Sequence, residues 1–458
     1  DLYNQIQNYK HDIPKLFQYN LLNIISDGTA AHYGSLTADF ERFTPWRLLD
    51  GEKVRGKTEL ELQVMVKGLL NPVTLMDFFF NFVAFGGESG QNTFKIIAQW
   101  HQYHGVKKAI ERALDALTKR KDGKGGVLWF TQGSGKSLLA LFYVMNLREH
   151  PEFKNPTVVV VTDRNDLDGQ LYDTFALSSW SLRGSPVQAE ERAELKEILA
   201  STEAGGIVFT TINKFAPEQG KNVVDTLCER SNVIVIADEA HRGQYGLEEK
   251  VDATTGQVKI GTARKIRDSL PNATYIGFTG TPISNKDKST TEVFGNYIDV
   301  YDMTQAVEDG VTRPVYYESR VIHLKLDESV LEAIDNEYMV MEETAEYHVI
   351  ERSKKELGRM DSILGAEQTL NALVDDIIDH YENNRAQELT GKAMIVAYSR
   401  PIAMKIYKRI LELRPAWTEK VGVVMTSGNN DPEEWRKIIG NKHHKDELAK
   451  KFKDNNMM

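Results

Sequence analysis

The heptapeptide TQGSGKS at Thr131–Ser137 has the residue types that bind a polyphosphate. It follows the apolar run Gly125–Phe130 and continues into the helix-like run Ser137–Leu147, which predicts a strand, a glycine-rich turn and a helix. Such a turn directs unpaired backbone N–H groups and a helix N-terminus toward one point, which favours an anion. Lys136 adds a mobile positive charge for the outer phosphates, and the Ser137 hydroxyl can ligate Mg²⁺. The predicted nucleotide-binding residues in this turn are Thr131, Gln132, Gly133, Ser134, Gly135, Lys136 and Ser137.

Two carboxylates follow another apolar run. Asp238 and Glu239 come directly after Asn232–Ala237, so we expect them at the carboxyl end of a buried strand. A carboxylate there can hold the Mg²⁺ that bridges nucleotide phosphates, and a second can orient and deprotonate the attacking water. We assign the metal to Asp238 and the water to Glu239; the alternative is a pair of acids that caps the next helix. The predicted catalytic residues are Lys136, Asp238, Glu239 and His241, and the predicted Mg²⁺ ligands are Ser137 and Asp238.

Two other segments place polar groups after apolar runs. Thr279, Gly280 and Thr281 end one run, where hydroxyl groups can couple the acidic motif to a neighbouring domain. The alternative is a simple Thr/Gly/Pro turn. Arg164 follows the run Val158–Val161, where it can contact a nucleic-acid phosphate backbone.

The segment QWHQYHGV at Gln99–Val106 lies upstream of these motifs. The amide of Gln102 can pair with the N6 and N7 edge of adenine. His101 and His104 are three residues apart on an expected helix, which also suits metal ligands. Because no further Cys, His or acidic cluster nearby in the sequence supplies a third ligand, we interpret both as packing or surface histidines.

The pattern around these motifs predicts an α/β fold. From Gly126 to about Val321, short Val- and Ile-rich runs alternate with helical patterns. Runs of this kind are typical of strands buried on both faces of a parallel sheet. Several such strands separated by helices predict a doubly wound domain with ligands at the carboxyl ends of the strands. The expected strands are VLWF, TVVVVTD, GIVFTTI, NVIVIADE and ATYIGFTG.

The flanking segments differ from this central pattern. Residues 1–85 are predicted to form one unit with strands at LLNIISDG and ERFTPWR, and a helix is expected from about Thr93 to Lys119. Glu328 to about Arg385 is acidic and helical. Strands at Lys392–Ser399 and Lys420–Gly428, with a helix between them, then restart the α/β pattern. A doubly wound sheet usually has about five or more strands, so this last unit is predicted to be incomplete and the sequence to be a fragment.

Composition limits the class of protein. The chain of 458 residues predicts two to four domains, and its 41% hydrophobic content is typical of globular proteins. No apolar run reaches the roughly 18 residues needed to cross a bilayer. The polar N-terminus lacks a signal peptide and Cys228 is the only cysteine, so we expect a cytoplasmic protein with no membrane association and no disulfide framework. The net charge of −10 argues against a uniformly basic surface but permits a locally basic groove.

Together, these motifs resemble those of superfamily 2 helicases and translocases: TQGSGKS as motif I, VVVVTDRNDLDGQ as motif Ia, DEAH as motif II and GFTGTP as motif III. The chain is more narrowly similar to the motor (R, HsdR) subunit of type I restriction enzymes. That resemblance covers essentially the whole chain, and it is carried by HQYHGV, VTDRNDLDGQL, DEAHRGQYG and residues 294–320.

The resemblance implies four domains. Residues 1–85 would be the latter part of a PD-(D/E)xK-type nuclease domain, with Gln5 and Tyr9 as its QxxxY motif, although this pair also occurs on many helices. Residues 86–321 would be a first RecA-like motor domain, 322–390 a helical linker and 391–458 the beginning of a second RecA-like domain. Ser399 and Arg400 would lie near the nucleic-acid path. The nuclease catalytic residues would precede residue 1, and motifs V and VI, the latter with its arginine finger, would follow residue 458.

The function implied by the resemblance is that of an enzyme. The chain would belong to an ATP- and Mg²⁺-dependent translocase and endonuclease subunit that pulls double-stranded DNA before cleaving it. Its partners would be the methyltransferase (M) and specificity (S) subunits of the type I complex. Two alternatives remain at this point: a superfamily 2 helicase that separates strands, and a fragment that binds nucleotide and DNA without turnover.

Overall fold

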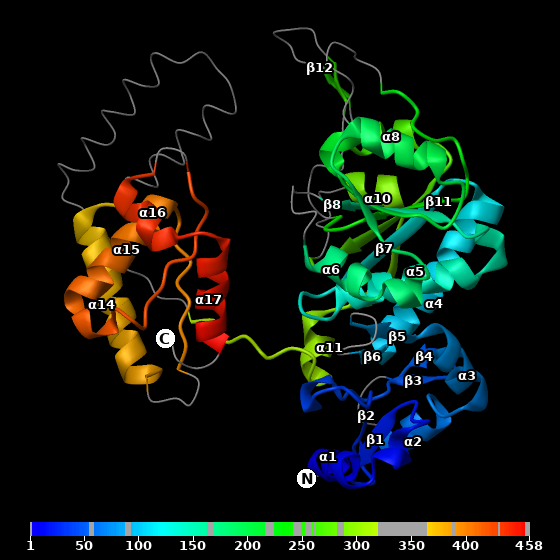
Figure 1. Cartoon of the computed structure of the whole chain (residues 1–458), viewed down its shortest axis with the longest axis horizontal. Coiled ribbons are helices and arrows are strands. Elements are labelled where there is room, and N and C mark those ends of the chain that lie inside the picture. Colours follow the sequence, from blue (N-terminus) through cyan, green and yellow to red (C-terminus); the bar gives the residue numbers. More distant parts are fainter. Residues whose placement is uncertain are drawn as a thin grey trace. The chain divides into compact units, whose positions relative to one another are not determined.

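A computed structural model of the chain describes residues 2–54, 59–87, 93–162, 169–215, 224–240, 249–251, 258–260, 262–281, 288–318, 364–386, 391–428 and 431–453. The chain divides into two compact units, residues 1–315 and 316–458 (Figure 1). Within the described ranges, no helix has both the length and the apolar character that a membrane span requires.

A seven-stranded parallel sheet is the centre of the first unit. Its strand order is β15-β7-β14-β11-β8-β10-β9, and every neighbouring pair is parallel. The strands are β7 (Lys124–Phe130), β8 (Thr157–Thr162), β9 (Val187–Ala189), β10 (Ile207–Thr211), β11 (Val233–Ala237), β14 (Thr274–Thr279) and β15 (Tyr297–Tyr301). The doubly wound parallel sheet predicted from the sequence is therefore confirmed, and the five predicted strands are all present. The two additional strands, β9 and β15, are its edges.

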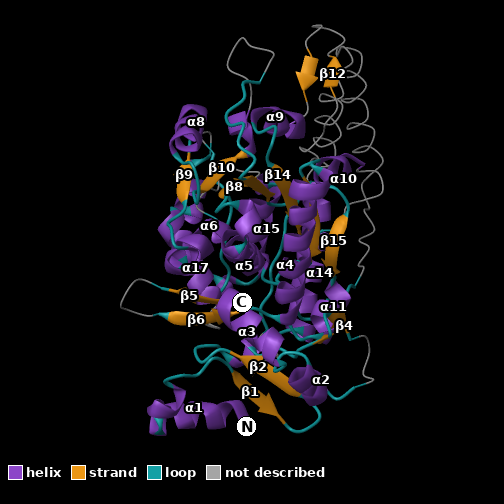
Figure 2. Cartoon of the chain, turned by 90° about the vertical axis from the view of Figure 1, so that its right-hand side faces the viewer, coloured by secondary structure: helices purple, strands orange, loops and turns teal. Residues whose placement is uncertain are grey.

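Helices cover both faces of this sheet (Figure 2). Val158 and Val160 of β8 belong to one hydrophobic core, whereas Val159 and Val161 belong to the core on the opposite face. Because alternate side chains point to opposite faces, a strand covered on both sides must be apolar throughout. The described α-helices of this unit from residue 100 onward are α4 (Trp100–Asp115), α5 (Lys136–Glu149), α6 (Gln170–Leu177), α7 (Ser179–Leu182), α8 (Arg192–Ser201), α9 (Thr262–Ser269), α10 (Lys288–Phe294) and α11 (Met303–Glu308).

The N-terminal elements extend the core beside α4 and α5. Trp46 and Phe82 pack on Tyr103 of α4, with ring centroids 5.4 and 4.5 Å away, and Phe82 also contacts Phe142 of α5. This covering explains why α5 is apolar on nearly all sides. The elements are α1 (Leu2–Asp12), β1 (Asn23–Ser26), β2 (Ala31–Gly34), β3 (Leu48–Leu49), β4 (Glu52–Lys53), α2 (Glu61–Lys67), α3 (Pro72–Asn81), β5 (Val83–Gly86) and β6 (Phe94–Ile97). A separate short pair, β12 (Glu249–Val251) and β13 (Val258–Ile260), is antiparallel.

Two predictions in this region are wrong. The strand expected at ERFTPWR is instead a short 3-10 helix at Phe40–Arg42 followed by an isolated bridge at Thr44, and β1 pairs with β2. The helix expected from Thr93 begins only at Trp100, because Phe94–Ile97 pairs with β5. Gln99 and Gln102 form a reciprocal capping box that fixes this start.

The described part of the second unit is helical. It contains α14 (Glu367–Asn384), α15 (Arg400–Leu413), α16 (Glu433–Ile439) and α17 (Lys442–Lys453), and α14 packs on α15 through branched apolar side chains. The prediction of strands at Lys392–Ser399 and Lys420–Gly428 is wrong. The described residues there form neither helix nor strand. Val396 is 83% exposed. A strand needs a neighbour for its backbone hydrogen bonds, and these segments pair with none in the described ranges.

Candidate nucleotide site

The sheet topology brings three of the predicted motifs together. Strands β7, β14 and β11 are consecutive neighbours, so the segments that follow their carboxyl ends converge at one edge. These segments are Thr131–Ser137, Gly280–Thr281 and Asp238–Glu239. A cavity of about 1450 Å³ borders this edge and is lined by Gln132–Leu138, Asp238 and Glu239.

The turn before α5 is shaped to receive an anion. Gly133 and Gly135 have φ angles of 85° and 80°, in the left-handed region that glycine adopts without strain. The Ser134 hydroxyl and its backbone N–H donate to the Thr131 carbonyl at 2.6 and 3.2 Å, which closes the turn on itself. In the described part of the chain, the N–H groups of Gln132, Gly133 and Lys136 have no hydrogen-bond partner. These donors and the N-terminus of the 14-residue helix α5 border the cavity.

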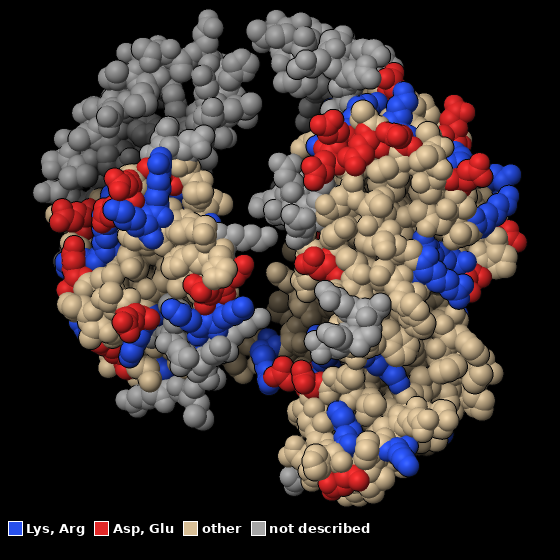
Figure 3. Space-filling view, viewed as in Figure 1, with Lys and Arg blue, Asp and Glu red and all other residues tan. Residues whose placement is uncertain are grey.

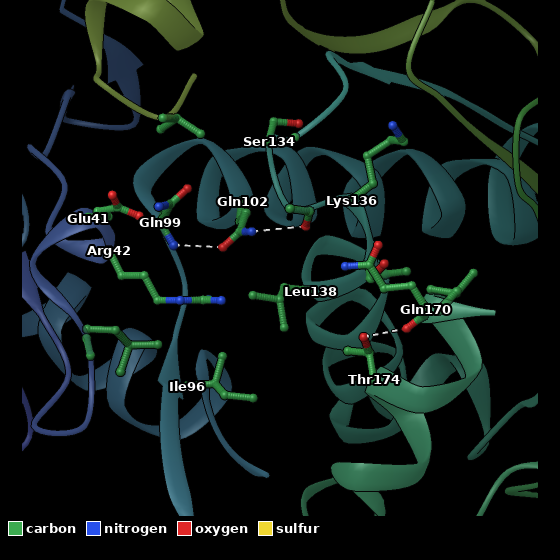
Figure 4. A pocket seen from close by; sticks show the side chains of 18 of the residues that line it. Glu41, Arg42, Ile96, Gln99, Gln102, Ser134, Lys136, Leu138, Gln170 and Thr174 are labelled. Carbon is green, nitrogen blue, oxygen red and sulfur yellow. Dashed lines mark hydrogen bonds between the residues drawn. The ribbon is translucent and has the colours of Figure 1, made fainter. Parts of the chain in front are cut away.

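Side chains of helix α4 form hydrogen bonds with this turn. Gln102 Nε2 donates to the Gly135 carbonyl at 3.1 Å, and Oε1 accepts from the Gln99 N–H at 2.8 Å (Figure 4). A Cβ added to Gly105 would lie 2.7 Å from the Phe130 ring, so glycine permits α4 to approach β7 this closely. Gln102 lines the cavity, and each end of its amide already makes one hydrogen bond. Each end keeps a further position for adenine, because the amide nitrogen carries a second N–H and the oxygen a second lone pair.

His101 is the second contact from α4 to the turn. Burial lowers the pKa of His101 to about 4, so the ring is neutral at pH 7 and its Nε2–H can donate to the Ser134 carbonyl, 3.0 Å away. Burial likewise lowers the pKa of His104 to about 4. Among the described residues, no group of three His, Cys, Asp or Glu side chains is placed to hold a metal ion. The interpretation of both histidines as packing residues agrees with this burial.

The turn after β14 lies beside the Lys136 ammonium group. A Cβ added to Gly280 would lie 2.7 Å from Lys136 Nζ, so only glycine leaves the ammonium group in its present place. The Thr279 hydroxyl donates to the Thr281 carbonyl at 2.9 Å and accepts from the Thr281 N–H at 3.2 Å. Thr279 therefore stabilises its own turn, while the missing side chain of Gly280 leaves room for Lys136 Nζ.

The acidic pair is held between strands. Asp238 N–H donates to the Val161 carbonyl at 3.0 Å, and Ala240 N–H to the Phe278 carbonyl at 2.9 Å. Glu239 has a φ of 48°, a left-handed conformation that costs a non-glycine residue about 1–3 kcal/mol. The Ser137 hydroxyl and the Asp238 carboxylate both border the cavity and are oxygen ligands of the kind that Mg²⁺ prefers.

Two further predicted site residues, Arg164 and His241, lie outside the described residues. Gln5 Nε2 donates to the Tyr9 hydroxyl at 2.7 Å along α1, so this pair is in contact but away from the cavity lining.

Ser399 and Arg400, in the second unit, both have partners near α15. Ser399 caps α15 by accepting from the Ile402 N–H at 3.4 Å. Arg400 forms an ion pair with Asp431 and lies 5.9 Å from the Trp435 ring centre.

Part of the cavity is lined by residues that no local sequence motif marks. Residues 37–43 and 309–313 contribute to it although they are far from the motifs along the chain. Figure 4 shows Arg42 pointing across the cavity toward Leu138, below the Gln99–Gln102 pair, with Gln170 and Thr174 of α6 on the opposite side. Tertiary packing alone brings these residues to the site.

Comparisons with known proteins identify the family. Residues 101–349 match the model of the SWI2/SNF2 ATPase family. The chain is 42% identical over 462 residues to the type I restriction enzyme HindI endonuclease subunit of Haemophilus influenzae, covering 99% of this chain and 43% of the relative. It is 35% identical over 477 residues to the MjaIXP endonuclease subunit of Methanocaldococcus jannaschii, with the same two coverages of 99% and 43%. The chain thus spans less than half the length of these relatives.

Solved structures resemble the chain more distantly. The Sulfolobus solfataricus SWI2/SNF2 ATPase core in complex with double-stranded DNA is 15% identical, with a TM-score of 0.29 over 78% of this chain and 75% of that one. The family model covers more than half of the chain and contains TQGSGKS and DEAH. The chain therefore belongs to the SWI2/SNF2 ATPase family, and it is similar to the endonuclease subunits of type I restriction enzymes.

Proposed function

We propose that this chain carries the ATP-driven motor of a type I restriction endonuclease subunit and translocates double-stranded DNA. One observation carries the proposal. A glycine turn with free N–H donors and a lysine borders the same cavity as two carboxylates from a neighbouring part of the sheet. This arrangement lies within the region that matches an ATPase family.

In the proposed reaction, the N–H groups of the turn bind the phosphates and Lys136 Nζ neutralises charge on the outer ones. Ser137 and Asp238 would hold Mg²⁺, which would supply positive charge to stabilise the transferred phosphoryl group. Glu239 orients the attacking water and accepts its proton. His241 is proposed to belong to the same catalytic group, with Thr279, Gly280 and Thr281 coupling the site to a neighbouring domain.

Translocation requires grips on DNA that do not depend on sequence, and contacts with phosphates have this property. Arg164, Ser399 and Arg400 are the proposed contacts. On the face in Figure 3, the described Asp and Glu side chains gather over α8, and Lys and Arg form smaller groups. This charge distribution is therefore more compatible with DNA binding in a locally basic groove than with binding on a uniformly basic face. Methyltransferase and specificity subunits are the proposed partners, and Gln5 and Tyr9 the proposed nuclease residues.

The test measures nucleotide binding and DNA-stimulated ATP hydrolysis of the 458-residue chain, alone and with the partner subunits. We expect Glu239→Gln to retain nucleotide binding but to lower turnover about 100-fold or more, as loss of a general base does. Glu152→Gln, at an exposed site outside the cavity, is the matched control and should change neither quantity. A folded chain that binds no ATP, or a Glu239→Gln variant with unchanged turnover, would contradict the proposal.

A further inference from the structure

A buried carboxylate joins the N-terminal elements to the nucleotide site. The Asp309 side chain is only 3% exposed. Its Oδ1 accepts from Arg47 Nε at 3.2 Å, and its Oδ2 accepts from Trp100 Nε1 at 2.8 Å and from the Tyr301 hydroxyl at 2.9 Å. Arg47 precedes β3, Trp100 begins α4 and Tyr301 ends β15. One carboxylate therefore fixes three elements that are distant in the sequence.

The buried Asp309 carboxylate needs its hydrogen-bond donors in fixed positions. A buried carboxylate is costly unless donors surround it, and here a guanidinium, an indole N–H and a phenol satisfy it. Burial, with the nearby Asp309 charge, raises the pKa of Tyr301 well above its usual value, so its hydroxyl keeps the proton that it donates. Arg47 Nη2 forms an ion pair with Glu61 Oε1, 2.9 Å away. Removing Arg47 would leave Asp309 without its ion-pair partner.

From Asp309, contacts continue to the phosphate-binding turn by two routes. The Tyr301 ring stacks on His101, with centroids 3.9 Å apart and planes 6° from parallel, and His101 contacts the Ser134 carbonyl. The Tyr301 carbonyl also accepts directly from the Thr131 N–H at 2.9 Å. On the second route, Thr312, three residues after Asp309, lies 3.5 Å from the place that a Gly133 Cβ would occupy. Tyr301, which donates to Asp309, therefore reaches the turn both directly and through His101, and Thr312 lies beside Gly133.

We propose that Arg47, Asp309, Tyr301 and His101 are positioning residues through which the N-terminal elements set the affinity of the site for nucleotide. This inference rests on the proposed nucleotide function of the turn. A double-mutant cycle measures the energetic coupling between two such residues. The four residues touch the turn or one another, and they act on nucleotide through the turn.

The experiment is a double-mutant cycle on the full chain, with mant-ADP and Mg²⁺ as the probe. Arg47→Met removes the outer contact, whereas His101→Phe keeps the stacked ring and removes the donor to Ser134. We expect each change to weaken mant-ADP binding about fivefold or more, the lower end of typical coupling effects. In the double variant, Arg47→Met should add little to His101→Phe, because the main route is already broken. His101→Gln, which restores an N–H donor, should recover part of the affinity.

Arg120→Met is the matched control. Arg120 has a similar exposure, 27% against 23% for Arg47, and a comparable ion pair, but it lies at the amino end of β7, opposite the site. It should leave mant-ADP affinity unchanged. If Arg47→Met does not fold, Tyr301→Phe tests the same link by removing only the hydroxyl that donates to Asp309, and it should also weaken binding.

The outcomes separate the two proposals. A folded wild-type chain that does not bind mant-ADP would overturn the proposed function together with this inference. Normal wild-type binding, with folded Arg47→Met and Tyr301→Phe variants that also bind normally, would overturn the inference alone. Independent, multiplicative effects of Arg47→Met and His101→Phe would overturn it too.

Discussion

The N-termini of α5 and α15 are built from similar residues but satisfy their backbone groups differently. Each helix has 14 residues, follows an apolar run and begins with a cation, Lys136 or Arg400. At α15 the Ser399 side chain accepts from the Ile402 N–H, and Arg400 pairs with Asp431. At α5 the residue before the helix is Gly135, which has no side chain to cap it, and the first turn borders the cavity. A helix N-terminus becomes a ligand site when the chain leaves its donors unused.

The largest expected effect is a difference between Lys136 and Arg400 in what each contributes to ATP affinity. Lys136→Ala should weaken ATP binding up to about 100-fold, because a hydrogen bond to a charged group is worth about 1.5–3 kcal/mol. Arg400→Ala should leave ATP affinity unchanged, since its guanidinium already pairs with Asp431. Isothermal titration of both folded variants with ATP and Mg²⁺ checks this difference. Equal losses in the two variants would remove the distinction between the helices.

The second expectation concerns pH, because a titratable ring holds the turn at α5 whereas a serine caps α15. Burial lowers the pKa of His101 from 6.5 to about 4. The unfolded chain therefore takes up this proton first, and stability that is complete above pH 6.5 is lost as the pH falls from 6.5 toward 4. From pH 7.5 to pH 5, His101 should cost the first unit about 2 kcal/mol, with His104 acting in the same direction.

Urea unfolding at the two pH values measures this loss. His101→Phe, which cannot titrate, should reduce the loss by the His101 share. An unchanged pH dependence in that variant would show that His101 is not the responsible group.

A third change gives α5 the residue type that caps α15. Gly135→Ser should destabilise the first unit by about 1–2 kcal/mol, because the φ of 80° is costly for residues with a Cβ. It should also weaken nucleotide binding, because the new Cβ would lie 2.6 Å from Gln102 Nε2. Gly28→Ser is the matched control, with a φ of 93° and nothing within 4 Å of the new Cβ. This variant should lose stability through its backbone conformation, but its nucleotide affinity should be normal.

The smallest expected effect is at the α15 cap. Ser399→Ala should destabilise the second unit by about 1 kcal/mol, the usual cost of losing an N-cap. Nucleotide affinity should not change. Amide exchange of α15 gives the local stability, and titration with ATP gives the affinity. A loss of ATP affinity in this variant would assign Ser399 to the nucleotide site instead.

The predictable part of the fold is the part buried on two faces. Strands β8 and β11 could be predicted because packing on both sides requires unbroken Val and Ile. The edge strands β9 and β15 could not, because each carries polar residues: Gln188 in β9 is partly exposed, and Asp299 in β15 is buried beside Lys53. The same apolar signal gave a wrong prediction at Lys392–Ser399, where the described residues find no neighbouring strand.

The predictable part of the site is local in sequence. The turn Thr131–Ser137 and the pair Asp238–Glu239 follow strands directly, so the sequence could place them at one edge. The contacts of Asp309 and Arg42 with this region depend on tertiary packing and have no local pattern. Likewise, the ion pair that engages Arg400 comes from Asp431, 31 positions later in the chain.

Amide hydrogen exchange of the intact chain, with and without ATP and Mg²⁺, tests the central claim most directly. Bound phosphates should accept from the N–H groups of Gln132, Gly133 and Lys136 and slow their exchange, with little change at Ser399–Ile402. Protection at the start of α15 with none at the start of α5 would contradict the account.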